Sequence, residues 1–205
     1  VWHYGVRVTV SQLGPMRRSL ETARPRRRWW RRWTKRAAVA MILHQTENDG
    51  VEVMMIKRAD KEGDPWSGHM AFPGGRMDPE DEHGLATAKR ETFEEVGVML
   101  DECSTCIGRL SDITGRAHKR RRPMVVTPYV FEVEKRPPTR INHEVAEIVW
   151  IPLSYLSDHG NRERMTWQRK KISLNLPCYF YQGRRIWGLS LLMLDELIAL
   201  AKASE

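Results

Sequence analysis

Three glutamates in the middle of the chain have the spacing of a cation-binding face. Glu91, Glu94 and Glu95 stand at positions i, i+3 and i+4, so on a helix their carboxylates point to one side. Like charges at this spacing repel, and the macrodipole disfavours anions near a helix C-terminus, so local stability does not explain the cluster. A hard divalent cation explains it, because Mg²⁺ prefers oxygen ligands and completes its shell with water and phosphate oxygens.

Two neighbouring features distinguish this cluster from an ordinary charged helix face, which is the simpler interpretation. The glycine pair Gly74-Gly75 precedes the glutamates, and a glycine pair lets the backbone come close to a ligand. Arg90 stands directly beside the first glutamate. A solvated Glu-rich face accounts for neither feature, so we favour a functional site.

The elements around the cluster predict an α/β fold. Apolar, β-rich runs predict four strands, at 37–43, 51–57, 125–133 and 148–152. The first two runs flank a polar turn at 47–50 and are expected to pair antiparallel. A helix is expected over 84–96, after an acidic start at 78–81 and before a C-terminal cap at Gly97, and an amphipathic helix over 189–201. This order of elements implies an α/β sandwich.

The segment from Gly75 to Val98 closely resembles the Nudix box, written G-x5-E-x7-R-E-U-x-E-E-x-G-U with U an apolar residue. Residues 90–98 match it except that Thr92 replaces the first apolar residue. Glu82 stands at the required distance before Arg90, but six residues rather than five separate it from Gly75. The resemblance implies a Nudix-type α/β/α sandwich with a mixed β-sheet.

The resemblance also implies roles for individual residues. Glu91, Glu94 and Glu95 would ligate Mg²⁺ or Mn²⁺, the Gly74 carbonyl would reach the metal, and Arg90 would orient Glu91 by a charge-assisted hydrogen bond. Water would then attack one phosphorus of a diphosphate and expel a phosphate monoester.

The general base is left open between Glu91 and a glutamate outside the box. Glu144 and Glu147 are the outside candidates, and Glu147 is our first choice among them. The expected catalytic set is therefore Arg90, Glu91, Glu94 and Glu147. The expected substrate-binding residues are Gly75, Arg58 and Arg121. Arg121 belongs to a basic loop at 118–122, which either binds an outer phosphate of the substrate or is an ordinary solvent-exposed loop.

Several phrases are similar to the coenzyme A diphosphatase branch of the Nudix family, namely Ala71-Phe72-Pro73-Gly74-Gly75, Val126-Thr127-Pro128 and Ile186-Trp187-Gly188. An arginine usual in that branch is absent from the segment 61–67. The favoured substrate is coenzyme A or an acyl-CoA, giving phosphopantetheine and adenosine 3′,5′-bisphosphate. The alternatives are ADP-ribose, NADH or dinucleoside polyphosphates, or a role as an RNA-associated protein that binds nucleotide ends.

The charge is divided unevenly along the chain. Residues 1–36 carry eleven Lys and Arg against Glu21 alone, a net +10, whereas the remaining 169 residues carry a net −2. We therefore expect a basic, Arg/Trp-rich N-terminal extension at 1–35 and a Nudix hydrolase domain with a C-terminal helix at 36–205. The run at 26–33 interleaves arginine with tryptophan, which suits nucleic acid or an anionic membrane, although a lightly ordered arm with tryptophans packed on the domain is the simpler interpretation.

Composition excludes other classes of protein. The longest apolar stretches run to about seven residues, for example 37–43, against the ~20 needed to span a bilayer, so we expect no transmembrane segment. Three cysteines do not form a disulfide framework, which favours a reducing compartment and a soluble, cytoplasmic protein without a leader. The oligomeric state is open, with a homodimer possible.

Overall fold

The computed structural model describes residues 12–203 apart from 48–49, 65, 117–122 and 170–171. Two predicted features fall on the gaps. Asn48 and Asp49 of the expected turn lie outside the described residues, and so does Arg121 with the rest of the basic loop.

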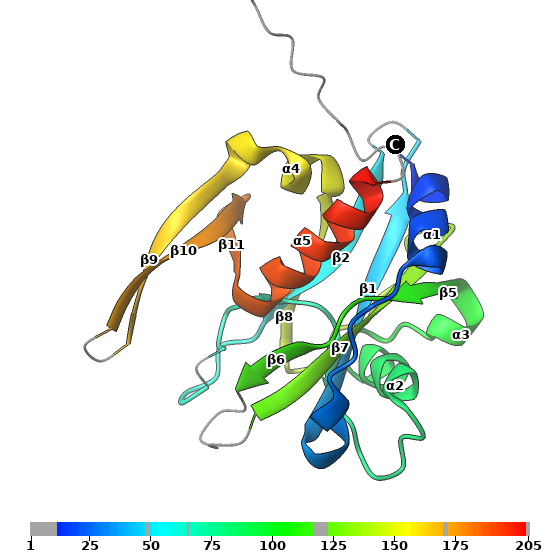
Figure 1. Cartoon of the computed structure of the whole chain (residues 1–205), viewed down its shortest axis with the longest axis horizontal. Helices are drawn as coiled ribbons and strands as arrows, with labels where there is room; N and C mark the ends of the chain where they lie inside the picture. Colours follow the sequence, from blue (N-terminus) through cyan, green and yellow to red (C-terminus); the bar gives the residue numbers. More distant parts are fainter. Residues whose placement is uncertain (1–11, 48–49, 65, 117–122, 170–171, 204–205) are drawn as a thin grey trace, which may run out of the picture.

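A mixed β-sheet forms the centre of the molecule (Figure 1). Its strands in chain order are β1 (Lys35–Gln45), β2 (Val51–Arg58), β3 (Met70–Ala71), β4 (Gly74–Arg76), β5 (Ser104–Arg109), β6 (Ile113–Arg116), β7 (Pro123–Val133) and β8 (Val145–Pro152). The path through the sheet is β3-β2-β1-β7-β5, with β4 paired to β1, β6 to β7 and β8 to β2. Strands β1 and β7 run parallel along their whole length, and the other pairs are antiparallel, including the predicted pair of β1 and β2.

The alternating side chains of β1 supply two separate cores. Ala38, Ala40 and Ile42 face α2 (Gly84–Val96) in one core, which also contains Ala88 and Val96 of that helix. Met41 and Leu43 face the other way, into a larger core with α1 (Leu13–Thr22), α4 (Leu153–Ser157) and α5 (Gly188–Lys202). A buried strand with apolar residues on both faces needs a helical layer on each side. The predicted α/β/α sandwich is therefore confirmed.

Local sequence determines both ends of α2. His83 is the N-cap, and its Nδ1 accepts a hydrogen bond from the Ala86 backbone N–H. Gly97 ends the helix in the left-handed region with φ of 72°, which glycine adopts without a steric penalty. The expected helix span and C-cap are thus confirmed, whereas the acidic residues at 78–81 lie in the loop before the helix. A one-turn helix, α3 (Leu100–Cys103), follows.

A second sheet follows α4 and the short 3₁₀ helix η2 (His159–Asn161), and the sequence patterns did not predict it. Its order is β11-β10-β9, with β9 (Arg162–Arg169), β10 (Ile172–Tyr181) and β11 (Arg184–Trp187) all antiparallel. Strands β9 and β10 project away from the main sheet (Figure 1). Strand β11 then leads directly into α5, which begins one residue before the predicted helix.

Part of the expected N-terminal extension is packed into the body. Leu13, Met16 and Leu20 of α1 are buried in the core shared with α5. The segment between α1 and β1 contains the 3₁₀ helix η1 (Trp29–Trp33) and is held by Asp112, whose carboxylate accepts the Arg28 backbone N–H at 2.9 Å. Within the described ranges, no helix is both long enough and apolar enough to cross a membrane.

Candidate active site

The glycine pair brings strand β4 against helix α2. The Gly74 N–H donates to Glu95 Oε2 at 2.9 Å, and a Cβ atom placed on Gly75 would lie 2.3 Å from Glu91 Oε1. Gly74 itself has φ of 150°, and a Cβ there would lie 2.3 Å from the Ala38 carbonyl oxygen of β1. Both positions therefore require glycine, Gly75 because of the Glu91 carboxylate and Gly74 because of the adjacent backbone of β1.

Burial raises the proton affinity of two of the three glutamates. Glu95 is only 3% exposed, and loss of hydration raises its pKa to about 7, partly opposed by the Gly74 N–H. The pKa of Glu91 is also raised, chiefly by burial, while Arg90 opposes the shift. Two poorly hydrated carboxylates close together disfavour ionisation, and a nearby cation reverses that effect.

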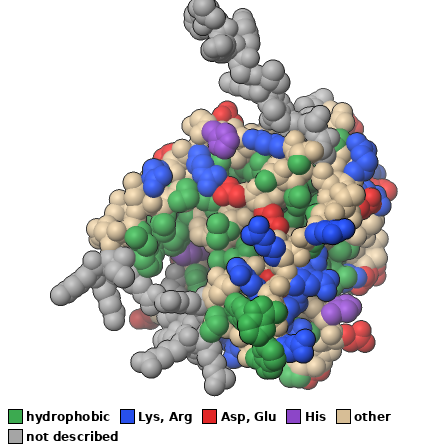
Figure 2. All heavy atoms as spheres, viewed as in Figure 1, with side chains coloured by type: hydrophobic (Ala, Val, Ile, Leu, Met, Phe, Trp, Pro, Cys, Tyr) green, Lys and Arg blue, Asp and Glu red, His purple; other side chains and the backbone are tan. Residues whose placement is uncertain are grey.

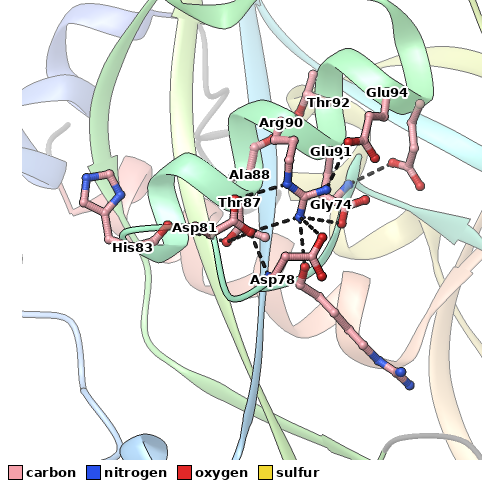
Figure 3. A network of polar contacts seen from close by, with 12 residues as sticks. Gly74, Asp78, Asp81, His83, Thr87, Ala88, Arg90, Glu91, Thr92 and Glu94 are labelled. Carbon is pink, nitrogen blue, oxygen red and sulfur yellow. Dashed lines mark hydrogen bonds and ion pairs between the residues drawn. The ribbon is translucent and has the colours of Figure 1, made fainter.

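Arg90 lies at the centre of a network of carboxylates (Figure 3). Its guanidinium makes a bidentate contact with Asp81, at 3.1 Å from Nε and 3.0 Å from Nη2. It also donates to Glu91 Oε1 at 3.1 Å, to Glu94 Oε1 at 3.2 Å and to the Arg76 carbonyl oxygen. The contact with Glu91 is the one expected of Arg90, and the hydrogen bond to Asp81 is the main cause of its raised pKa.

Asp81, rather than Glu82, anchors Arg90, and the sequence reasoning missed it. The Asp81 carboxylate also accepts the Asp78 N–H and the Thr87 hydroxyl, and its pKa falls to about 2, mainly through the hydrogen bond with Arg90. Glu82 is exposed. Five residues separate Gly75 from Asp81, which is the spacing of the first acid in the box. The extra residue of this chain therefore lies between the acid and Arg90, and an aspartate at the correct distance was the available signal.

Glu94 differs from its two neighbours although it shares their helix face. Its side chain is 53% exposed, and its carboxylate is turned toward Arg90. Thr92, the departure from the box pattern, is fully buried and donates its hydroxyl to the Ala88 carbonyl one turn earlier, so the substitution leaves no unpaired polar group in the core.

A cleft of about 1970 Å³ opens beside these carboxylates. Its walls come from the glycine loop, α2, the start of β7, strand β9 and the start of α5. The lining includes five predicted site residues, Gly74, Gly75, Glu91, Glu95 and Arg58, together with Glu144. Arg58 pairs with Asp64 at 3.2 Å, and its buried Nε has no hydrogen-bond partner within the described part of the chain.

The two candidate bases outside the box lie in different surroundings. Glu144 lines the cleft and its side chain is 45% exposed, and its negative charge contributes to the raised pKa of Glu95. Glu147 is not among the lining residues. Its carboxylate pairs with Arg184 at 2.6 Å and Lys57 at 3.7 Å, and the hydrogen bond from Arg184 lowers its pKa.

The donor set fits a hard cation that keeps several ligands from water and substrate. Among the described residues, no three His, Cys, Asp or Glu side chains converge closely enough to enclose a metal ion by themselves. Glu91 and Glu95 are the two that meet at the glycine loop. Mg²⁺ is typically bound by one or two carboxylates plus substrate phosphates, so this partial set is suitable.

Comparison with known proteins places the chain in a family. The NUDIX domain model matches residues 34–176. A peroxisomal coenzyme A diphosphatase of Caenorhabditis elegans, ndx-8, is 35% identical over 60% of this chain and 51% of its own length. An uncharacterised Nudix hydrolase, NudL, of Photorhabdus laumondii is 30% identical over 64% of this chain and 67% of its own length.

A solved structure shows the same fold. The crystal structure of a NUDIX hydrolase from Alicyclobacillus acidocaldarius superposes with a TM-score of 0.53 at 16% identity, over 81% of this chain and 91% of that one. The chain spans about half the length of the C. elegans relative, and 32% of the length of an uncharacterised Schizosaccharomyces pombe relative. With a domain match over most of its residues, the chain belongs to the Nudix family.

Proposed function

We propose that this chain is a metal-dependent diphosphatase that hydrolyses a nucleoside diphosphate linked to another moiety. The observation that supports this most strongly is the meeting of Glu91 and Glu95 with the Gly74-Gly75 loop at the edge of the cleft. Its family membership agrees, because Nudix hydrolases generally use divalent metals.

Glu91 and Glu95 are the residues that would hold Mg²⁺ or Mn²⁺, with the Gly74 carbonyl as a further candidate ligand. A bound divalent cation supplies charge neutralisation at the phosphate oxygens and lowers the pKa of a water molecule. Glu94 belongs to the predicted ligand set, but its contact with Arg90 and its exposure favour a supporting role. Arg90 fixes the position of Glu91 while Asp81 fixes Arg90.

Glu144 is the better candidate for the general base. A base has to reach the attacking water and has to be free to accept a proton. Glu144 lines the cleft. Glu147 is not a lining residue, and the side chains of Arg184 and Lys57 pair with its carboxylate and lower its pKa. We therefore place the base at Glu144, with Glu91 as the alternative within the box, and assign Glu147 to the packing of β8 against β2 and β11.

Coenzyme A or an acyl-CoA is the substrate we favour. The sequence phrases shared with the coenzyme A diphosphatase branch and the similarity to the C. elegans diphosphatase support this choice. The cleft also has room beyond the carboxylates, bordered by Trp167, Leu189 and Leu192, for a long group attached to the diphosphate. Arg58 stands at the same cleft, where its guanidinium can contact a phosphate.

The test is turnover by the purified chain with Mg²⁺ and then Mn²⁺. The substrates are coenzyme A, an acyl-CoA, ADP-ribose, NADH, dinucleoside polyphosphates and capped RNA, with products identified by mass. We expect adenosine 3′,5′-bisphosphate from coenzyme A, and loss of turnover with excess EDTA that added Mg²⁺ restores. Preference for ADP-ribose or NADH would reject the coenzyme A assignment but keep the diphosphatase. No turnover of any substrate would reject both.

A further inference from the structure

A basic, aromatic surface lies outside the catalytic residues. It consists of Arg26, Arg27, Arg28, Trp29, Arg32 and Trp33, which we call the Arg/Trp patch. All six residues are exposed, and Trp29 and Trp33 are 76% and 66% exposed. Figure 2 shows a cluster of hydrophobic side chains over the 3₁₀ helix η1, with Lys and Arg side chains around it. Large exposed aromatic groups of this kind usually mark an interaction surface.

The backbone under the patch is firmly attached to the domain. The Asp112 carboxylate accepts the Arg28 N–H at 2.9 Å, and the Asp112 N–H donates to the Arg26 carbonyl at 2.9 Å. The side chain of Asp112 is fully buried and also pairs with Arg109 and Arg31. The backbone that carries the patch is thus held in a defined position, and the arginine side chains of the patch are exposed.

We propose that the Arg/Trp patch docks the protein on a membrane that contains anionic phospholipid. Tryptophan is enriched at the headgroup level of membranes, because its ring is apolar and its N–H is polar. Arginines beside it attract lipid phosphates, each contributing about fivefold to binding near an anionic surface. Residues 12–36 carry ten Lys and Arg against Glu21 alone, so the charge complements such a surface.

The geometry of the rings favours a membrane over single-stranded nucleic acid. Trp29 and Trp33 meet edge to face, with centroids 5.7 Å apart and planes at 79°, so they do not form parallel platforms for successive bases. The Arg32 guanidinium lies 5.3 Å from the Trp33 ring centroid and covers part of that ring. Base stacking needs open ring faces, whereas insertion among headgroups needs only protruding indoles with cations beside them.

Docking through this patch would bring the cleft close to the headgroups. Helix η1 runs directly into β1, where Ala37 and Val39 line the cleft. Strand β1 also pairs with β4, with Ala37 opposite Arg76 and Ala38 opposite Gly75. An enzyme held this way would meet amphiphilic substrates where they partition into the bilayer. The docking itself does not depend on which nucleotide the cleft accepts.

Co-sedimentation of the full chain with vesicles tests the proposal. We expect binding to vesicles of phosphatidylcholine with phosphatidylglycerol, much weaker binding to phosphatidylcholine alone, and loss of binding at high salt. The double variant W29A/W33A should bind at least about tenfold more weakly, because two indoles leave the interface. The triple variant R26Q/R27Q/R28Q should bind about 10²-fold more weakly, from fivefold per arginine.

Matched controls separate the patch from general effects. L174A/F180A removes two other exposed apolar side chains, and K135Q/R140Q/R164Q removes three other positive charges. Both controls should bind vesicles like the wild-type chain. All variants should keep their thermal melting and their turnover, since none of these residues touches the cleft carboxylates.

Any of three results would overturn the proposal. The first is equal binding to anionic and neutral vesicles, and the second is equal binding by the patch variants and the controls. The third is tight binding to single-stranded RNA, lost in the patch variants, without binding to vesicles, which would assign the patch to nucleic acid.

Discussion

Replacing each glycine of the Gly74-Gly75 pair with alanine should damage a different property of the protein. A Cβ on Gly75 would lie 2.3 Å from Glu91 Oε1 and 2.4 Å from Oε2, so it would meet only the end of a flexible side chain. A normal contact is about 3.5 Å, which requires the carboxylate to move by roughly 1 Å. Misplacement of a catalytic group by 1 Å can reduce the rate about 10²-fold.

The stability of Gly75→Ala should change little. The carboxylate of Glu91 would lose its hydrogen bond from Arg90 Nη2, but Arg90 keeps its bidentate contact with Asp81. Partly exposed pairs of this kind contribute about 0–1 kcal/mol. We therefore expect a loss of about 10²-fold in kcat/KM with a free energy of unfolding within about 1 kcal/mol of the wild-type value.

Gly74→Ala should instead unfold the protein more easily. Its Cβ would lie 2.3 Å from the Ala38 carbonyl oxygen and 2.6 Å from Val39 Cα, and φ is 150°. Strand β1 cannot yield, because it is paired with β7 along its length. Overpacking costs about 1–3 kcal/mol and backbone strain a further 1–3 kcal/mol, so we expect a loss of about 2–6 kcal/mol.

Steady-state kinetics with Mg²⁺ and urea unfolding of both variants check this reasoning. The Glu91→Gln variant is a matched control, because it should reproduce the activity loss of Gly75→Ala without adding any atom to the glycine loop. Wild-type kcat/KM in Gly75→Ala, or equal destabilisation of the two glycine variants, would refute the geometry on which the argument depends.

Three further predictions concern charges at the site. Glu95 has a pKa of about 7 in the folded state and 4.5 in the unfolded state. In EDTA, the free energy of unfolding should therefore fall by about 3 kcal/mol as pH rises from 4.5 past 7. Urea unfolding across pH should show this slope for the wild-type chain but not for Glu95→Gln. The pKa of Asp81 is lowered from 3.8 to about 2, so above pH 4 this residue should contribute up to about 2 kcal/mol to the free energy of unfolding, and the contribution should be lost as pH falls toward 2. An Asp81→Asn variant with the same acid dependence as the wild type would contradict this. Glu144→Gln should lower kcat by about 10²–10⁴ with little change in KM, whereas Glu147→Gln should stay within a few fold; the reverse order would return the general base to Glu147.

Much of the fold could be predicted because its information is local. The span of α2 was predicted from the acidic residues before it and from Gly97, whose φ of 72° suits glycine. The pairing of β1 with β2 follows from two apolar runs joined by a short polar turn. The second sheet was missed because β9, with the sequence RERMTWQR, is mostly polar and has no strand pattern of its own. Strand β9 forms by antiparallel pairing with β10, and this pairing cannot be predicted from the sequence of β9 alone.

The site could be predicted only where its geometry depends on a regular helix. The i and i+4 positions of Glu91 and Glu95 place both carboxylates toward β4, and this followed from their spacing. Glu94 is oriented toward Arg90 because several carboxylates compete for that one guanidinium, and the spacing of residues along the helix does not predict which of them pair with it. The partnership of Arg90 with Asp81 depends on the path of the loop before α2, which has no periodic structure.

The charge distribution explains why the three glutamates have different roles. A single guanidinium, that of Arg90, lies within 3.4 Å of Asp78, Asp81, Glu91 and Glu94, so it balances only part of their charge. Exposed Glu94 is stabilised by water as well, but Glu95 is buried, and among the described residues its carboxylate accepts a hydrogen bond from the Gly74 N–H and none from Arg90. Because burial penalises an ionised carboxylate, Glu95 gains the most from a divalent cation. The most buried glutamate is therefore the one whose replacement should weaken metal binding most.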